Sequence, residues 1–154
     1  MSDTTTTSPK LKRSPTWLTR ELATFLKDHV NARFVWGTLD CCLFTADAIQ
    51  AMTGVDIASD FRGKYTDQAS AFALIKTVTG GSTVADAAAY CATKHDLTEW
   101  KHPLQAQRGD LVAVTNGTDL IAGVVDLSGR FVAALGESGI IHLSIRNITR
   151  AWHV

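Results

Sequence analysis

The sequence of 154 residues lacks an excess of charge of either sign. Fifteen Lys and Arg residues balance fifteen Asp and Glu residues, and charged residues make up 19% of the chain. A protein that binds nucleic acid or anionic lipid through its charge is expected to carry a basic surplus. We therefore expect no nucleic-acid partner. A transmembrane helix needs a run of about eighteen apolar residues, and no run in this sequence approaches that length. No membrane span is therefore expected.

Cysteine is scarce as well. The chain has three cysteines, and two of them, Cys41 and Cys42, are neighbours that pair only under strain. A disulfide framework is therefore excluded, and reduced thiols are expected, as in a cytosol. One pattern suits a metal site: Cys91 is followed by His95 four residues later. We prefer the interpretation that Cys91 is buried and His95 is exposed, without a metal. We expect no metal and no cofactor.

The composition divides the chain into an arm and one domain. Residues 1–15 are rich in Thr, Pro, Lys and Arg and hold too little apolar surface to fold alone. We expect a flexible N-terminal arm there, and a docking peptide is one role for it. Residues 16–154 are long enough to bury one continuous core.

Helical periodicity dominates the first part of this domain. Apolar spacing predicts a first amphipathic helix from about Thr16, and Asp40 is expected to cap a second helix that ends at Gly54. Further helices are predicted over residues 67–78 and 85–92.

Strand patterns follow Pro103. Alternating apolar residues between turn-forming residues predict strands at 111–114, 120–125, 131–135 and 140–145. Helices followed by an antiparallel meander indicate an α+β fold.

The position of Cys41 in the first turn of a predicted helix suggests chemistry. The free N–H groups and the positive dipole end of a helix N-terminus favour thiolate over thiol, which is how a nucleophilic cysteine arises. The alternative is structural, because free cysteine is often buried as a small apolar side chain.

The surrounding motif resembles a known family. Trp36-Gly37 followed by Asp40-Cys41 is similar to the nucleophile motif of the NlpC-type papain-like cysteine peptidases, and residues 107–112 resemble that superfamily's Gly-Asp entry into the sheet. Residues 62–65 and 151–154 resemble a small branch found in phages and prophages that has no assigned function.

The resemblance implies a papain-like fold in which the Cys41 helix packs on a small antiparallel sheet. It also implies that Cys41 is the nucleophile of an amide hydrolase, served by a histidine on an early strand. The matching place for that histidine is Ile121 or Ala122, so the base is missing from this sequence.

The chain has five histidines that could substitute for the missing base. His142 is the only one inside a strand pattern and is a weak candidate base, because the alternation places it with Ser144 on the polar face. The others are expected to be helix-cap or surface residues: His29, His95, His102 and His153.

These expectations combine into a first hypothesis and two alternatives. We expect a structural component of a phage tail, at the tail tip or in tail assembly, made in the host cytoplasm and carried in the virion. Its expected partners are other tail proteins, with peptidoglycan as a second candidate, and its active site is expected to be degenerate because catalytic groups act as a unit. The first alternative is an active cysteine peptidase or amidohydrolase that cleaves peptidoglycan peptides through Cys41. The second is a thiol-dependent acyltransferase or lipid-peptide binder.

Separately, we expect Arg62 to clamp a carboxylate such as Asp47 or Asp56.

Overall fold

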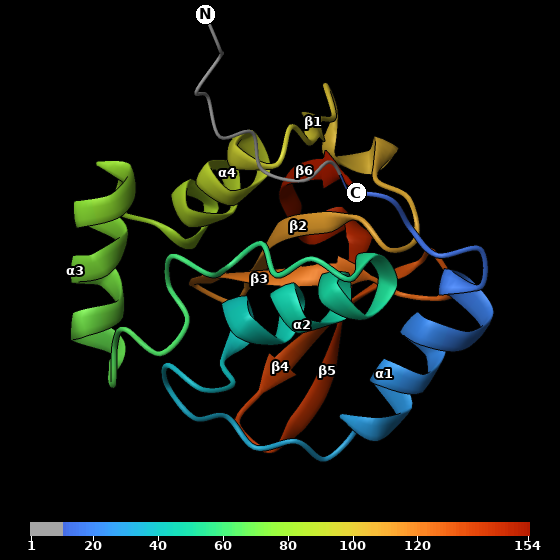
Figure 1. The fold of residues 1–154 in the computed structure, drawn as a ribbon, viewed down its shortest axis with the longest axis horizontal. Helices are drawn as coiled ribbons and strands as arrows, with labels where there is room; N and C mark the ends of the chain where they lie inside the picture. Colours follow the sequence, from blue (N-terminus) through green and yellow to red (C-terminus); the bar gives the residue numbers. More distant parts are fainter. Residues whose placement is uncertain (1–10) are drawn as a thin grey trace, which may run out of the picture.

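The computed structural model describes residues 11–154. In this part of the chain, helices pack against an antiparallel sheet of six strands, so the α+β prediction is confirmed. Figure 1 shows α2 lying across the sheet, with α1 and α3 on opposite sides of it.

The helices begin and end close to the predicted residues because local signals set their ends. The predicted cap Asp40 accepts a hydrogen bond from the backbone N–H three residues later, as do Asp67 and Thr83 before the next two helices. Gly54 and Gly80 close two helices in the left-handed conformation. The helical elements are η1 (Trp17–Glu21), α1 (Leu22–Asp28), α2 (Cys41–Thr53), α3 (Gln68–Thr79), α4 (Val84–Lys94), η2 (Pro103–Gln105) and η3 (Ile145–Asn147).

The sheet contains the predicted meander and two further strands. Its strands are β1 (Thr98–Glu99), β2 (Leu111–Asn116), β3 (Asp119–Val125), β4 (Phe131–Gly136), β5 (Gly139–Ser144) and β6 (Ile148–His153), in the order β1-β6-β2-β3-β4-β5. The sequence analysis missed β1 and β6. β1 is only two residues long, and the polar Thr149 and Arg150 weaken the alternation in β6.

Strands β3 and β4 are joined at one end only. They pair at Val124 with Ala133 and at Val125 with Val132. Next to these pairs lies Gly123, where a Cβ atom would sit 2.4 Å from Val132 Cγ1, so the close approach requires glycine. Beyond this point the two strands separate toward Asp119 and Gly136, and the sheet forks.

Apolar side chains cover both faces of the sheet. The larger cluster lies under the helices and includes Leu43, Phe44, Ile49 and Val124, all fully buried. The smaller cluster on the other face contains Val112, Val114, Val125, Val132, Ile148 and Ala151. Because α2 is held between α1 and the forked strands, its first turn is fixed relative to β3.

The described end of the expected flexible arm is bound to the domain. Arg13 hydrogen-bonds the carboxylate of Asp110 at 2.8 Å and the carbonyl of Val154 at 2.9 Å, and the N–H of Ser14 donates to the carbonyl of Met52 at 2.8 Å. Residues 13 and 14, at the end of the expected arm, therefore contact the domain directly. The sequence alone does not show that Arg13 belongs to the domain, because its buried partner Asp110 lies 97 positions away along the chain. The rest of the expected arm, residues 1–10, lies outside the described residues.

Candidate functional site

Asp40 organises the turn that presents Cys41. Its carboxylate is 1% exposed and accepts the N–H of Leu43 at 3.0 Å, the N–H of Gly37 at 3.1 Å and the hydroxyl of Tyr65. Burial, followed by the bond to Asp40, raises the pKa of the Tyr65 phenol well above its usual value. The Tyr65 hydroxyl thus stays a proton donor to Asp40 and holds the cap in place.

The Trp36-Gly37 turn depends on glycine. Gly37 has a φ of +78°, and a Cβ atom there would lie 1.9 Å from the carbonyl oxygen of Tyr65. Only a residue without a side chain allows these two backbone segments to meet. The resembled motif Trp36-Gly37…Asp40-Cys41 is therefore one structural unit together with Tyr65.

Cys41 is the first residue of α2, and it faces the sheet as predicted. Interactions with Cys42 and with the backbone N–H of Ala122 in β3 lower the pKa of Cys41, although burial and the Asp40 charge oppose this. The pKa of Cys42 moves in the opposite direction, raised by its bond to Cys41 and by burial. Cys41 is therefore the thiol of this pair that ionises first.

The fork in the sheet explains why Ala122 reaches the sulfur. Val125 hydrogen-bonds the two residues that precede β2. Its N–H donates to the carbonyl of Asp110, and its carbonyl accepts from the N–H of Gly109. Hydrogen-bonding directions alternate along a strand, so Ala122, three residues earlier, directs its N–H toward β4. Pairing with β4 has ended at Val124, which leaves this N–H for Cys41.

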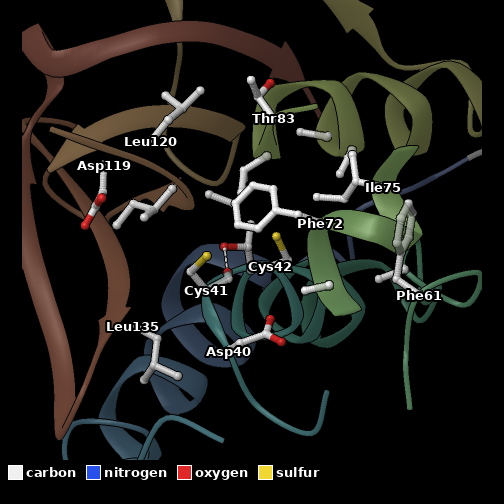
Figure 2. A pocket seen from close by; sticks show the side chains of 18 of the residues that line it. Asp40, Cys41, Cys42, Phe61, Phe72, Ile75, Thr83, Asp119, Leu120 and Leu135 are labelled. Carbon is white, nitrogen blue, oxygen red and sulfur yellow. Dashed lines mark hydrogen bonds between the residues drawn. The ribbon is translucent and has the colours of Figure 1, made fainter. Parts of the chain in front are cut away.

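A cavity of about 600 Å³ surrounds the two adjacent thiols, between the helices and the forked strands. Figure 2 shows Phe72 and Ile75 on one side of Cys41 and Cys42, and Leu120 and Leu135 on the other. Cys91 of α4 also lines this cavity, and burial raises its pKa to about 12. All three cysteines of the chain thus meet at one site, although the sequence separates Cys91 from the other two.

None of the histidines, all of which lie in the described part of the chain, lines the cavity. The candidate base His142 lies in β5 with its side chain 61% exposed, and its Nδ1 is 4.0 Å from the Asp126 carboxylate. The structure therefore does not bring Cys41 and His142 together. Ala122, one of the two positions at which the resemblance calls for histidine, lies against Cys41 and lines the cavity.

The other histidines serve local structure. His29 is the C-cap of α1 and contacts the Phe25 carbonyl at 2.7 Å, while His102 caps η2. The expectation that His95 lies at the surface is wrong: it is 4% exposed, and neither ring nitrogen has a partner among the described residues. The backbone turns at Asp96, which has a φ of 57°. His95, just before this turn, is buried and does not belong to an exposed polar link.

Arg62 forms the expected clamp. Its guanidinium bonds Asp56 at 2.9 Å and Asp47 at 2.6 Å, which joins the loop after α2 to α2 itself. The bonds to Asp56 and Asp47 raise the pKa of Arg62 despite its partial burial. This loop also carries Phe61 and Tyr65, which line the cavity, so the clamp supports one cavity wall.

Comparison with known proteins gives one match. The sequence profile of a family described as "Domain of unknown function (DUF6950)" matches residues 12–154. The chain belongs to this family. No curated protein and no solved structure shows a significant match to the chain.

In this DUF6950 domain, Asp110 is the main buried anchor outside the cavity. Its carboxylate, fully buried, bonds Arg13, the indole N–H of Trp100, the N–H of Gln107 and, at 3.1 Å, the imidazole of His153. In the sequence, Gly109-Asp110 stands out only through the resemblance of residues 107–112 to a Gly-Asp entry into a sheet. The structure shows that it fastens the start of the domain, the link before β2 and the end of β6 to one another.

Two general findings complete the site description. Within residues 11–154, no group of three or more His, Cys, Asp or Glu residues is arranged to hold a metal ion. Over the same residues, every helix is too short or too polar to cross a membrane.

Proposed function

We propose that this chain is an NlpC-type, papain-like domain that has lost peptidase activity and serves as a structural component of a phage tail. One observation carries the loss of activity: Ala122 lines the cavity together with Cys41 where the resemblance calls for histidine, and no imidazole lines the cavity within the described residues. Amide hydrolysis needs a group that protonates the leaving amine, and a thiolate alone does not supply it.

The architecture supports the papain-like part of the proposal. A cysteine at the head of a buried helix packs against an antiparallel sheet, and the strand beside it is the one on which the resemblance places the base. Support for the tail location comes from the resemblance of residues 62–65 and 151–154 to a phage-associated branch. In the structure these segments form the Arg62 clamp region and the end of β6, which are structural elements that an assembly protein retains.

The alternative of an active cysteine peptidase is favoured by a separate observation. The lowered pKa of Cys41 and the N–H of Ala122 at its sulfur are features of a reactive thiol. A thiolate of this kind can attack a carbonyl in either proposal. The two proposals differ in whether the site also transfers a proton to the leaving amine.

A genetic test separates the two proposals. Phage particles that carry Cys41→Ser are compared with particles from which the whole chain is deleted, and both are scored for tail morphology by electron microscopy and for infectivity. The structural proposal predicts normal particles for Cys41→Ser and defective tails for the deletion. Normal tails in the deletion strain contradict the assembly role, and normal tails without infectivity in Cys41→Ser favour the peptidase.

A further inference from the structure

The cavity around Cys41 has the size and lining of a ligand site. Its volume of about 600 Å³ lies within the range of roughly 300–1,000 Å³ that is typical of small-molecule sites. Apolar side chains dominate its walls, contributed by the loop after α2, by α3 and by both forked strands: Ile57, Phe61, Phe72, Ile75, Leu120 and Leu135. Such walls suit an extended hydrocarbon chain, because burial of each methylene group is favourable and needs no polar partner.

The opening of the cavity carries negative charge. Asp119 and Glu137 line the cavity and are exposed, which places them where it meets solvent. Neither carboxylate has an ion-pair partner among the described residues. A free fatty acid would bring its own negative charge to this opening, whereas a neutral ester or thioester would not. The occupant is therefore expected to be uncharged at its reactive end.

The thiol in this cavity suits one class of acyl donor. In an amide, the leaving amine must receive a proton, and no imidazole stands near Cys41 to deliver it. In a thioester, the leaving group is a thiol with a pKa of about 8.5, which departs as the thiolate without an acid. The missing base thus blocks amide cleavage but not transfer of an acyl group from one sulfur to another.

We propose that Cys41 is an acylation site, which takes a medium- or long-chain acyl group from a thioester and keeps the chain in the apolar cavity. The Cys41 thiolate attacks the thioester carbonyl, a new sulfur–carbon bond forms, and the bond to the carrier sulfur breaks. The electron pair leaves with the carrier as its thiolate, and the proton that Cys41 released to solvent is available to that thiolate. The acyl group and its electrons are conserved, so no oxidant or reductant is needed.

The adduct is expected to persist. Its hydrolysis requires a base that activates water, and that base is absent in the proposed function on which this step rests. The apolar walls also exclude water from the new thioester. The chain would then carry a stable lipid-like group inside its fold instead of turning over substrate.

The test uses the purified full chain and neutral N-acetylcysteamine thioesters with acetyl or octanoyl groups. Intact-mass spectrometry follows the adduct, and fragment masses assign the acylated residue. We expect one octanoyl group per chain on Cys41, formed about tenfold or more faster than the acetyl adduct, because the longer chain buries more methylene groups. Cys41→Ser should abolish the adduct, and fragment masses should show that neither Cys42 nor Cys91, the other two thiols of the cavity, is acylated in its place.

A matched pair on α3 tests the role of the cavity. Ala71 is buried and lines it, whereas Ala73, two residues later, is exposed and does not. We expect Ala71→Leu to slow octanoylation severalfold more than acetylation, and Ala73→Leu to change neither rate. Because the ratio of the two rates is measured on one folded sample, a general loss of stability does not imitate this result.

Three results would overturn the inference. They are the absence of any adduct on Cys41, equal rates for acetyl and octanoyl donors, and continuous release of free carboxylic acid. The last result also contradicts the loss of catalysis in the proposed function, whereas the first two leave that proposal intact.

Discussion

The backbone N–H of Ala122 favours the thiolate form of Cys41 and lowers its pKa, at the place where the resemblance to cysteine peptidases calls for an imidazole. This contact exists because β3 and β4 separate after Val124 and leave the N–H unpaired in the sheet. The site therefore retains a means of stabilising a thiolate, while no imidazole lines its cavity. The following predictions rest on that division.

Cys41 should be the most reactive of the three thiols. Its pKa is lowered by the Cys42 and Ala122 donors, whereas burial raises the pKa of Cys91 to about 12. At a pH near 7, iodoacetamide should label Cys41 first, as read by fragment masses in the folded protein. The control is the same labelling in denaturant, where the three rates should converge. Equal rates in the folded protein would show that no thiol is privileged.

Ala122→His should restore part of the missing chemistry. The side chain at position 122 lines the cavity beside Cys41, so an imidazole there forms a thiolate–imidazolium pair and lowers the pKa of Cys41 further. We expect the pH at which iodoacetamide labelling is half-maximal to fall by about one unit or more. Ala134→His, a buried position in the neighbouring strand that does not line the cavity, is the control and should leave that pH unchanged. An unchanged profile in Ala122→His would contradict the placement of Ala122.

Asp40→Ala should destabilise the fold strongly. The substitution removes a helix cap and leaves the N–H of Gly37 and the Tyr65 hydroxyl buried without an acceptor. Its cost in the free energy of unfolding should be on the order of 3 kcal/mol. Asp67→Ala removes the exposed cap of α3 and should cost clearly less than Asp40→Ala. Urea unfolding measures both, and equal losses would argue against the buried network.

Arg62→Ala should lower the melting temperature by a few degrees. The ion pairs to Asp47 and Asp56 are partly exposed, so the expected loss is about 1 kcal/mol, or roughly 2–4 °C. Burial alone would raise the pKa of Asp56, but the bonds from Arg62 and the Ala58 N–H lower it overall. A lowered folded-state pKa contributes stability above the unfolded value of about 3.9, and this contribution is lost as the pH falls through the folded value.

The difference between wild type and Arg62→Ala should therefore be full near neutral pH and shrink below about pH 4. Arg150→Ala breaks a more exposed pair with Glu99 and serves as the control, with a smaller expected loss. A melting temperature that does not change in Arg62→Ala would refute the clamp.

Asp110→Asn should be among the most damaging conservative substitutions. The carboxylate is fully buried beside Arg13, so its neutralisation leaves the guanidinium without its counter-charge, at a cost of about 3 kcal/mol. Asp126→Asn changes a turn carboxylate that has no Arg or Lys partner within residues 11–154, and it should cost less. Thermal unfolding followed by tryptophan fluorescence compares the two, since Trp100 bonds Asp110 directly.

The sequence predicts those parts of the fold that short-range signals control. The helix of Cys41 is foreseen with both its ends, because Asp40 and Gly54 are cap residues within the same segment. The meander is foreseen because alternation and turn residues act over neighbouring strands. The clamp of Arg62 follows from a loop arginine close in sequence to Asp47 and Asp56.

Long-range features escape sequence analysis. The cavity arises from the separation of β3 and β4, which depends on contacts across the sheet, and Cys91 joins the site from a helix that lies far along the chain. The addition of β6 beside β2 and the burial of His95 likewise depend on tertiary packing. Tyr65 was noted only as part of a resemblance, and its bond to Asp40 is visible only in three dimensions.

The proposed loss of peptidase activity is tested most directly by incubating the purified protein with purified peptidoglycan peptides and quantifying the products by liquid chromatography and mass spectrometry. Wild type is compared with Cys41→Ser under identical conditions at neutral pH. We predict that wild type releases no more cleaved peptide than Cys41→Ser does, because no imidazole stands beside the thiol. Cleavage by wild type that disappears in Cys41→Ser would contradict the degenerate site and establish an active cysteine peptidase.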